Sequence, residues 1–257
     1  MSSLSFDFQG ASGELLSGRI EKPQGTARGW AIFAHCFTCG KDSLAAVRVS
    51  RALARYGVGV LRFDFVGLGS SGGNFGSAGF STDVNDLVAA ALALSNAGMA
   101  PSLLVGHSLG GAAALSAAGA IKTVKAVATI GTPSDVAHVQ HLLQPDVVHE
   151  IETEGGSMVS FGGKTFHLSR RFLDSLRRES LMSRVKILGL PLLILHAPSD
   201  NIVGIDNAQA LFDAASHPKN FIAIEGADHM LSSRGESEYV AAVISAWAEP
   251  YLRTPNI

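Results

Sequence analysis

Short, wholly apolar runs recur along the 257-residue chain, and segments with helical spacing lie between them. A strand covered on one face alternates apolar and polar side chains, whereas a strand buried on both faces is apolar throughout. The sequence therefore predicts a mostly parallel sheet with helices on both faces, an α/β architecture of three layers. The expected strands are 30–34, 59–65, 103–105, 124–130, 192–195 and 221–224, after an opening hairpin of 6–9 and 15–21.

The expected helices are 44–56, 83–96, 112–120, 168–179 and 239–247. Gly57 is a typical signal for the end of the first helix, and Ser81 or Thr82 is a suitable N-cap for the second. Residues 134–188 interrupt the pattern, because they are more polar and contain two Gly-Gly pairs. Long insertions in compact domains are usually functional or disordered. We expect a single domain over residues 1–257, with a small cap at 134–188 above the carboxyl edge of the sheet.

The composition restricts the partners that the chain can have. Hydrophobic residues make up 47% of the chain and charged residues 16%, so a large core is expected. The formal net charge is −2 and no run of Lys or Arg is present, which argues against a nucleic-acid partner. Residues 87–121 are uncharged, but Asn96, Gly98 and Pro101 divide them into pieces shorter than the roughly 20 residues of a membrane span. We therefore expect a small-molecule partner and no membrane span.

The most informative motif is Gly106-His-Ser-Leu-Gly110, which follows the apolar run 103–105 and precedes a stretch of small residues. A serine on a sharp strand-to-helix turn requires glycine two residues to either side, because a Cβ there would collide with the backbone. The amides at the start of the helix favour negative charge near the serine oxygen. Ser108 is the predicted nucleophile. The alternative is a chance match, since Gly and Ser are abundant in this chain.

A serine hydroxyl needs a neighbouring base, and that base must be oriented by a third group. His229 follows the last apolar run, and Asp200 follows the run 192–195. Both residues therefore fall at the carboxyl edge of the sheet, in the chain order Ser, Asp, His. We predict a catalytic triad of Ser108, His229 and Asp200.

Other residues compete for these roles. Asp135 is the second candidate for the acid, because it follows the neighbouring strand that ends near Ile130. His196 is interpreted as a packed, hydrogen-bonded core residue. His107 is expected to point away from the nucleophile. Asp64 is expected to fix the turn around it through side-chain hydrogen bonds.

Cys36 and Cys39 form a Cys-x-x-Cys between an expected strand and an expected helix, where redox-active dithiols occur. Our interpretation is two half-buried thiols that pack the loop, and thiol-redox chemistry is the alternative. Further ligands at zinc-like spacing are missing, so no metal or cofactor is expected. The N-terminal sequence has no secretory pattern and two cysteines cannot build a disulfide framework, so we expect the reducing cytoplasm.

These motifs together resemble the α/β-hydrolase superfamily over essentially the whole chain. The matching pieces are His35-Cys-Phe, Asp64-x-x-Gly-x-Gly-x-Ser71, Gly106-His-Ser-Leu-Gly110, Asp200 and the loop that ends at His229. The resemblance implies an eight-stranded, mostly parallel sheet whose second strand is antiparallel. More narrowly, residues 35–42 and 131–135 are similar to the hydrolase half of bacterial hydrolase/OsmC fusion proteins, as a stand-alone relative or an excised domain.

The resemblance also implies an oxyanion hole with two backbone donors. One donor would be the N–H of Leu109, directly after the nucleophile. The other would be the N–H of Phe37, in the loop after the third strand. The sequence departs from the family pattern at Cys36, where glycine is usual and where a side chain makes the backbone less free. Loss of one donor typically lowers turnover by about 10²–10³-fold, so this departure bears directly on activity.

The predicted function is hydrolysis of carboxylic esters with short to medium acyl groups, through an acyl-enzyme. Family resemblance supports this preference, because ester hydrolysis is the commonest use of such a site. Hydrolysis of thioesters, amides or carbon–carbon bonds on the same triad is the alternative within this class. A thiol-redox accessory that uses Cys36 and Cys39 is the alternative of another class. A catalytically idle binding module is disfavoured, since all three triad residues are present.

Overall fold

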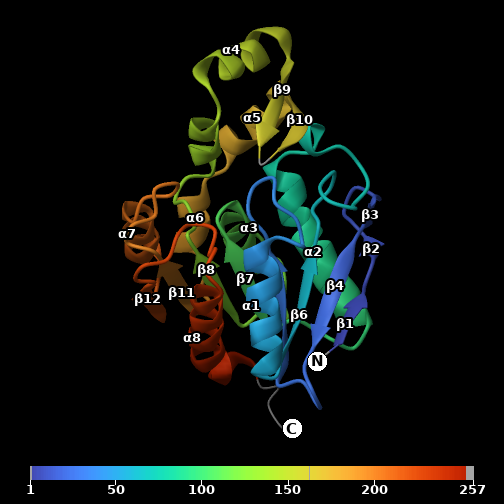
Figure 1. The fold of residues 1–257 in the computed structure, drawn as a ribbon, viewed down its shortest axis with the longest axis vertical. Helices are drawn as coiled ribbons and strands as arrows, with labels where there is room; N and C mark the ends of the chain where they lie inside the picture. The colour runs from blue at the N-terminus through green and yellow to red at the C-terminus, as the bar shows by residue number, and fades with distance from the viewer. Residues whose placement is uncertain (1, 162, 253–257) are drawn as a thin grey trace.

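Eight strands form one twisted sheet with helices on both faces in the computed structural model, which describes residues 2–161 and 163–252 (Figure 1). The strand order is β1-β4-β6-β5-β7-β8-β11-β12. β4 pairs antiparallel with both of its neighbours, and the strands from β6 to β12 pair in parallel. The expected fold, including the antiparallel second strand, is confirmed. The strands are β1 (Ser2–Ser5), β4 (Gly18–Lys22), β5 (Gly29–Ala34), β6 (Val58–Phe63), β7 (Leu103–His107), β8 (Ala126–Ile130), β11 (Leu192–His196) and β12 (Lys219–Ala223).

The opening hairpin starts earlier than the sequence pattern predicts. β1 pairs with β4 in the main sheet, while β2 (Phe8–Gln9) and β3 (Leu15–Leu16) form a separate two-stranded sheet. The first arm has no continuous apolar face, because Ser2, Ser3 and Ser5 flank Leu4, and hydrophobic periodicity therefore does not mark it.

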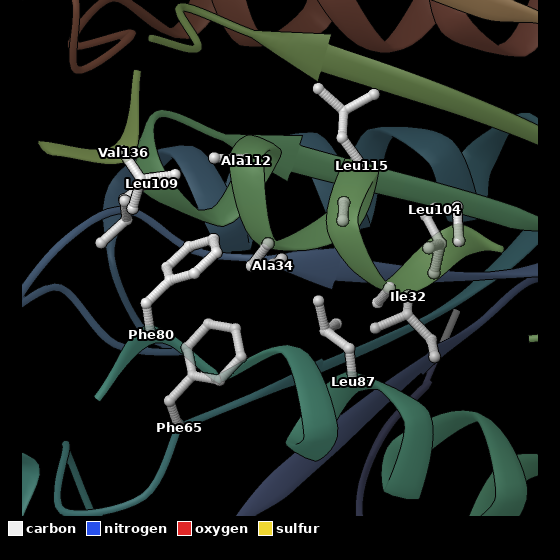
Figure 2. Packing of buried hydrophobic residues seen from close by; sticks show 14 of the residues in the cluster. Ile32, Ala34, Phe65, Phe80, Leu87, Leu104, Leu109, Ala112, Leu115 and Val136 are labelled. Carbon is white, nitrogen blue, oxygen red and sulfur yellow. The ribbon is translucent and has the colours of Figure 1, made fainter. Parts of the chain in front are cut away.

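Two groups of helices cover the two faces of the sheet. α1 (Leu44–Arg55) and α8 (Arg234–Leu252) pack on one face. α2 (Phe80–Asn96), α3 (Leu109–Ala118), α6 (Leu181–Lys186) and α7 (Asp206–Ala214) pack on the other. Figure 2 shows apolar side chains of the core between the sheet and this second group of helices. They include Phe80 and Leu87 of α2, Leu115 of α3 and Ile32 of β5. No helix among the described residues combines the length and the apolar character needed to cross a bilayer.

The start of α2 corrects the sequence prediction. The helix begins at Phe80, and its N-cap is Gly79 rather than Ser81 or Thr82. Gly79 has φ 124°, a conformation that side chains rarely adopt, so the chain can enter the helix one turn earlier. The Phe80 N–H donates to Ser175 Oγ at 3.0 Å. A side chain distant in sequence thus caps the helix, which local sequence cannot predict.

Residues 134–188 form a segment of mixed structure between β8 and β11, which we call the cap segment. Figure 1 shows α4 (Pro145–Glu154) and the strands β9 (Gly156–Phe161) and β10 (Lys164–Ser169) at the top of the molecule, beyond the end of the sheet. The hairpin of β9 and β10 was not predicted, and the expected helix 168–179 starts at Arg170 because Ser169 caps it through Phe172 N–H. The elements are η2 (Val136–Leu142), α4 (Pro145–Glu154), β9 (Gly156–Phe161), β10 (Lys164–Ser169), α5 (Arg170–Arg178) and α6.

A buried arginine connects the sheet to the loop that follows β5. The Arg62 side chain on β6 is 2% exposed and donates to Glu21 Oε1 at 2.9 Å. It also donates to the Lys41 carbonyl at 2.5 Å and to Asp42 Oδ1 at 2.7 Å. Because one guanidinium satisfies three acceptors, it fixes the far end of this loop relative to two strands.

We expect Arg62→Leu to lower the free energy of unfolding by about 3–5 kcal/mol, because removing one partner leaves a buried charge without compensation. Glu21 would keep the Ser3 hydroxyl, at 3.0 Å, and as its cation only Arg51, which is 3.7 Å away and half exposed. Urea unfolding measures the change. Arg234→Leu is the matched control, because Arg234 pairs with Glu238 on the surface of α8 at 3.0 Å, where a change below about 1 kcal/mol is expected. Equal small losses in both variants would contradict the prediction.

Candidate active site

Ser108 lies on the sharp turn between β7 and α3. Its backbone has φ 55° and ψ −127°, a strained conformation for a residue with a side chain. The Ser108 N–H donates to the Ile130 carbonyl at 2.8 Å, and the Ser108 carbonyl accepts from Gly111 N–H at 2.9 Å. These bonds to β8 and α3 hold the turn in place. Ser108 is buried but borders a cavity at the end of the sheet.

The glycines of the motif are explained by close backbone approach. A Cβ on Gly106 would collide with the backbone of Gly110 and Gly111 in the first turn of α3. A Cβ on Gly110 would collide with the carbonyl groups of Ala34 and His35 at the end of β5. The turn can therefore form only with glycine at both positions, as the spacing predicts.

His229 and Asp200 are brought together from loops that follow two neighbouring strands of the sheet. His229 Nδ1 lies 2.7 Å from Asp200 Oδ2, and both side chains are buried. Asp200 Oδ1 accepts from the N–H groups of Ile202 and Val203, each at 2.9 Å. Burial by itself would raise the pKa of Asp200, but the bonds from His229 and the two amides outweigh it, so the pKa lies below its usual value. Asp200 is therefore ionised at neutral pH and orients His229.

Ser108 and His229 border the same cavity of about 770 Å³. Residues of the cap segment and of the loops after β5, β6, β11 and β12 complete its wall. Polar side chains, including Lys41, Asp64 and Lys164, also line it. The apolar side chains that line it are Phe37, Leu142, Phe161, Ile202 and Met230.

Asp135, the second candidate for the acid, lies elsewhere. Its carboxylate caps η2 by accepting from Ala137 N–H at 2.9 Å, and it is exposed. His196 is fully buried and donates from Nε2 to the Val203 carbonyl at 2.7 Å. This bond supports the loop that also binds Asp200. His196 therefore has the structural role that the sequence predicts.

His107 has a role that sequence reasoning missed. Its Nε2 lies 2.7 Å from the His229 carbonyl, and the two rings are 5.2 Å apart. A carbonyl oxygen can only accept, so His107 carries its proton on Nε2. Burial lowers the pKa of His107 to about 3, so the ring is neutral at neutral pH. His107 thus holds the backbone of the proposed base, across 122 positions of sequence that no local pattern connects.

Asp64 fixes its turn, as expected, and also forms a buried ion pair. Its Oδ2 accepts from Ser70 N–H at 2.9 Å, and its Oδ1 accepts from Lys41 N–H at 2.6 Å. Lys41 Nζ donates to Asp64 Oδ2 at 2.6 Å. Sequence reasoning did not select Lys41, because an isolated lysine in a loop is usually exposed.

The two cysteines are not free thiols. Cys36 and Cys39 form a disulfide bond, with their Cα atoms 5.3 Å apart. The interpretation of two half-buried thiols is therefore wrong, because the chain turns back between them. Cys39 N–H donates to the Cys36 carbonyl at 3.1 Å, which closes a four-residue turn around Phe37 and Thr38.

Two backbone amides correspond to the expected oxyanion donors, that of Phe37, which lines the same cavity as Ser108, and that of Leu109, which follows Ser108 in sequence. In the part of the chain that the structure describes, neither the Phe37 N–H nor the Leu109 N–H has a hydrogen-bond partner. Leu109 is the first residue of α3, where amides have no partner within the helix. The Phe37 ring packs against Phe75, Phe161 and Phe172, so the cap segment contacts the same loop.

Comparisons with known proteins identify hydrolases. The sequence model of a family described as serine aminopeptidase, S33, matches residues 27–151. The chain is 27% identical over 220 residues to palmitoyl-protein thioesterase ABHD10, mitochondrial, of Mus musculus, a match that covers 83% of this chain and 73% of that protein. The crystal structure of the esterase domain from a Rhodothermus marinus protein is 44% identical, with a TM-score of 0.80, and the match covers 98% of this chain and 100% of that domain.

Proposed function

The chain belongs to the α/β-hydrolase superfamily, and we propose that it is a serine hydrolase that cleaves carboxylic esters. The observation that carries this proposal is the bond between His229 Nδ1 and Asp200 Oδ2, at 2.7 Å, beside a cavity that Ser108 also borders. With Nδ1 donating to a carboxylate, His229 Nε2 is left as the acceptor that a serine hydroxyl needs.

In the proposed mechanism, His229 takes the Ser108 proton while Oγ attacks the ester carbonyl. The negative charge on the carbonyl oxygen is stabilised by the N–H groups of Leu109 and Phe37. His229 then gives its proton to the departing alcohol, which leaves the acyl group on Ser108. Water repeats the sequence and releases the acid.

Two observations support short to medium acyl groups. The cavity has apolar residues in its wall from the cap segment and from the loops after β5, β11 and β12, which suits a hydrocarbon chain. Its volume of about 770 Å³ is in the range of small-molecule sites. The 44% identical protein is described as an esterase domain, which also favours esters over amides.

Thioester hydrolysis is the second candidate, because the mouse relative is named a thioesterase. The same proposed triad and oxyanion donors serve both reactions, since each passes through a tetrahedral oxyanion. The distinction rests on the leaving group. An alcohol needs a proton from His229 as it departs, whereas a thiolate leaves more readily.

We expect a fluorophosphonate probe to label Ser108 and to block hydrolysis of p-nitrophenyl butyrate. The reason is that the probe reacts with serines that a neighbouring base activates. Peptide mapping by mass spectrometry identifies the labelled residue. Comparison of kcat/KM for butyrate esters with that for the matched thioesters decides between the two candidates. Absence of labelling together with absence of ester and thioester turnover would contradict the proposal.

A further inference from the structure

We propose that the Cys36–Cys39 disulfide positions the Phe37 N–H as an oxyanion donor, so that its reduction by a dithiol lowers turnover. This inference rests on the proposed esterase function, because it concerns the stabilisation of an oxyanion. The disulfide closes a turn next to the catalytic cavity, and both cysteines and Phe37 line that cavity.

The orientation of the Phe37 N–H is set by the carbonyl of the same peptide unit. The Cys36 carbonyl accepts from His35 Nδ1 at 2.9 Å and from Cys39 N–H at 3.1 Å. A trans peptide is planar, with its N–H directed opposite to its C=O. Two bonds to the Cys36 oxygen therefore fix the direction of the Phe37 N–H, which itself has no partner among the described residues.

His35 supplies one of these two bonds from a buried position. Its Nε2 accepts from Phe65 N–H at 3.5 Å, so its proton is on Nδ1 and is donated to the Cys36 carbonyl. Burial lowers the pKa of His35, so the ring is neutral at neutral pH. The core side of the loop is thus held without the disulfide.

The other bond depends on the turn that the disulfide closes. Thr38 occupies the third position of this turn with φ 55°, where glycine or asparagine is preferred and a β-branched residue is rare. The local sequence therefore disfavours the turn that the structure requires. The covalent link between Cys36 and Cys39 compensates, because it holds the two ends of the turn together. It also accounts for a side chain at position 36, where the family pattern has glycine.

Reduction removes this constraint by a balanced exchange. A dithiol such as dithiothreitol attacks one sulfur as a thiolate, forms a mixed disulfide and then closes on itself. The Cys36–Cys39 bond breaks, two thiols form, and the dithiol is oxidised to a cyclic disulfide with the transfer of two electrons and two protons. Both cysteines line the cavity, and Cys39 is the more exposed residue of the two, because it is half-buried whereas Cys36 is 4% exposed.

The test is the turnover of the full chain with and without dithiothreitol, on p-nitrophenyl butyrate. We expect kcat to fall by about 10²–10³-fold on reduction, the loss that follows removal of one oxyanion donor. KM should change little, because the donor acts mainly in the transition state. A Cys36→Ala/Cys39→Ala variant should have the same low kcat, and dithiothreitol should not change it further. Alkylation and mass spectrometry report the state of the cysteines.

Different results separate this inference from the proposed function. If oxidised enzyme neither turns over esters nor reacts with the fluorophosphonate, the proposed function fails. If it is active and the alanine variant keeps full kcat at a temperature where it is folded, the positioning role is overturned. A lower melting temperature with unchanged kcat has the same meaning, because it shows a purely structural disulfide. Should the variant not fold, the effect of dithiothreitol on the wild-type chain still decides.

Discussion

Replacement of either Ser108 or His229 by alanine is expected to lower kcat for a p-nitrophenyl ester by about 10⁶-fold, and replacement of both should cost no more. The reason is that the two side chains act as a unit. Without His229, the Ser108 hydroxyl keeps its proton and is a poor nucleophile. Without Ser108, His229 has no proton to transfer to the leaving alcohol. Steady-state kinetics with the two single variants and the double variant measures this lack of additivity.

Two matched controls separate loss of chemistry from loss of structure. Ser116 is a buried serine within α3, and His149 is an exposed histidine of α4. Ser116→Ala and His149→Ala should retain kcat within a few-fold, and all variants should unfold at similar urea concentrations. Full activity of Ser108→Ala, or a second large loss in the double variant, would contradict a shared mechanism.

Much of the sheet could be predicted because its parallel strands are buried on both faces. Apolar runs such as 103–105 and 192–195 mark β7 and β11 without reference to the rest of the chain. The exceptions have physical causes. β1 is at the edge of the sheet, and three of its four residues, Ser2, Leu4 and Ser5, are exposed. The β9–β10 hairpin lies in the cap segment, where a continuous apolar run is not required.

The candidate site could be predicted in part, because a nucleophile turn has strict local requirements. A Cβ on Gly106 or on Gly110 would collide with neighbouring backbone, so the turn around Ser108 requires glycine at both positions. The supporting contacts could not be predicted. The bonds from His107 to His229 and from Arg62 to Lys41 join residues that only the fold brings together.

The cysteine pair shows the limit of a spacing argument. A separation of three residues permits free thiols, a redox pair or a closed disulfide, and composition favoured the first. The turn closed by Cys39 N–H and the Cys36 carbonyl decides for the disulfide, since it brings the Cα atoms to 5.3 Å. That turn depends on Thr38 at positive φ, which local preference argues against.

Asp200→Asn is expected to lower kcat by about 10⁴-fold while leaving the fold intact, because the loop after β11 determines how an asparagine side chain is oriented there. Asp200 Oδ1 accepts from the N–H groups of Ile202 and Val203, so the amide oxygen of an asparagine must occupy that position. Its NH₂ group then faces His229 Nδ1, which lies 2.7 Å from the present Oδ2. His229 Nδ1 must then accept a hydrogen bond, so the ring proton moves to Nε2. A protonated Nε2 cannot take the proton of Ser108.

The tautomer provides a readout that a merely structural change would not move. ¹⁵N chemical shifts of the His229 ring should show Nδ1 protonated in the wild-type chain and Nε2 protonated in Asp200→Asn. Asp135→Asn is the control, because the Asp135 carboxylate caps η2 and is exposed. It should change neither kcat nor the His229 spectrum. If Asp135→Asn lost activity while Asp200→Asn retained it, the orienting acid would be the other carboxylate, and the bond between His229 and Asp200 would have no part in turnover.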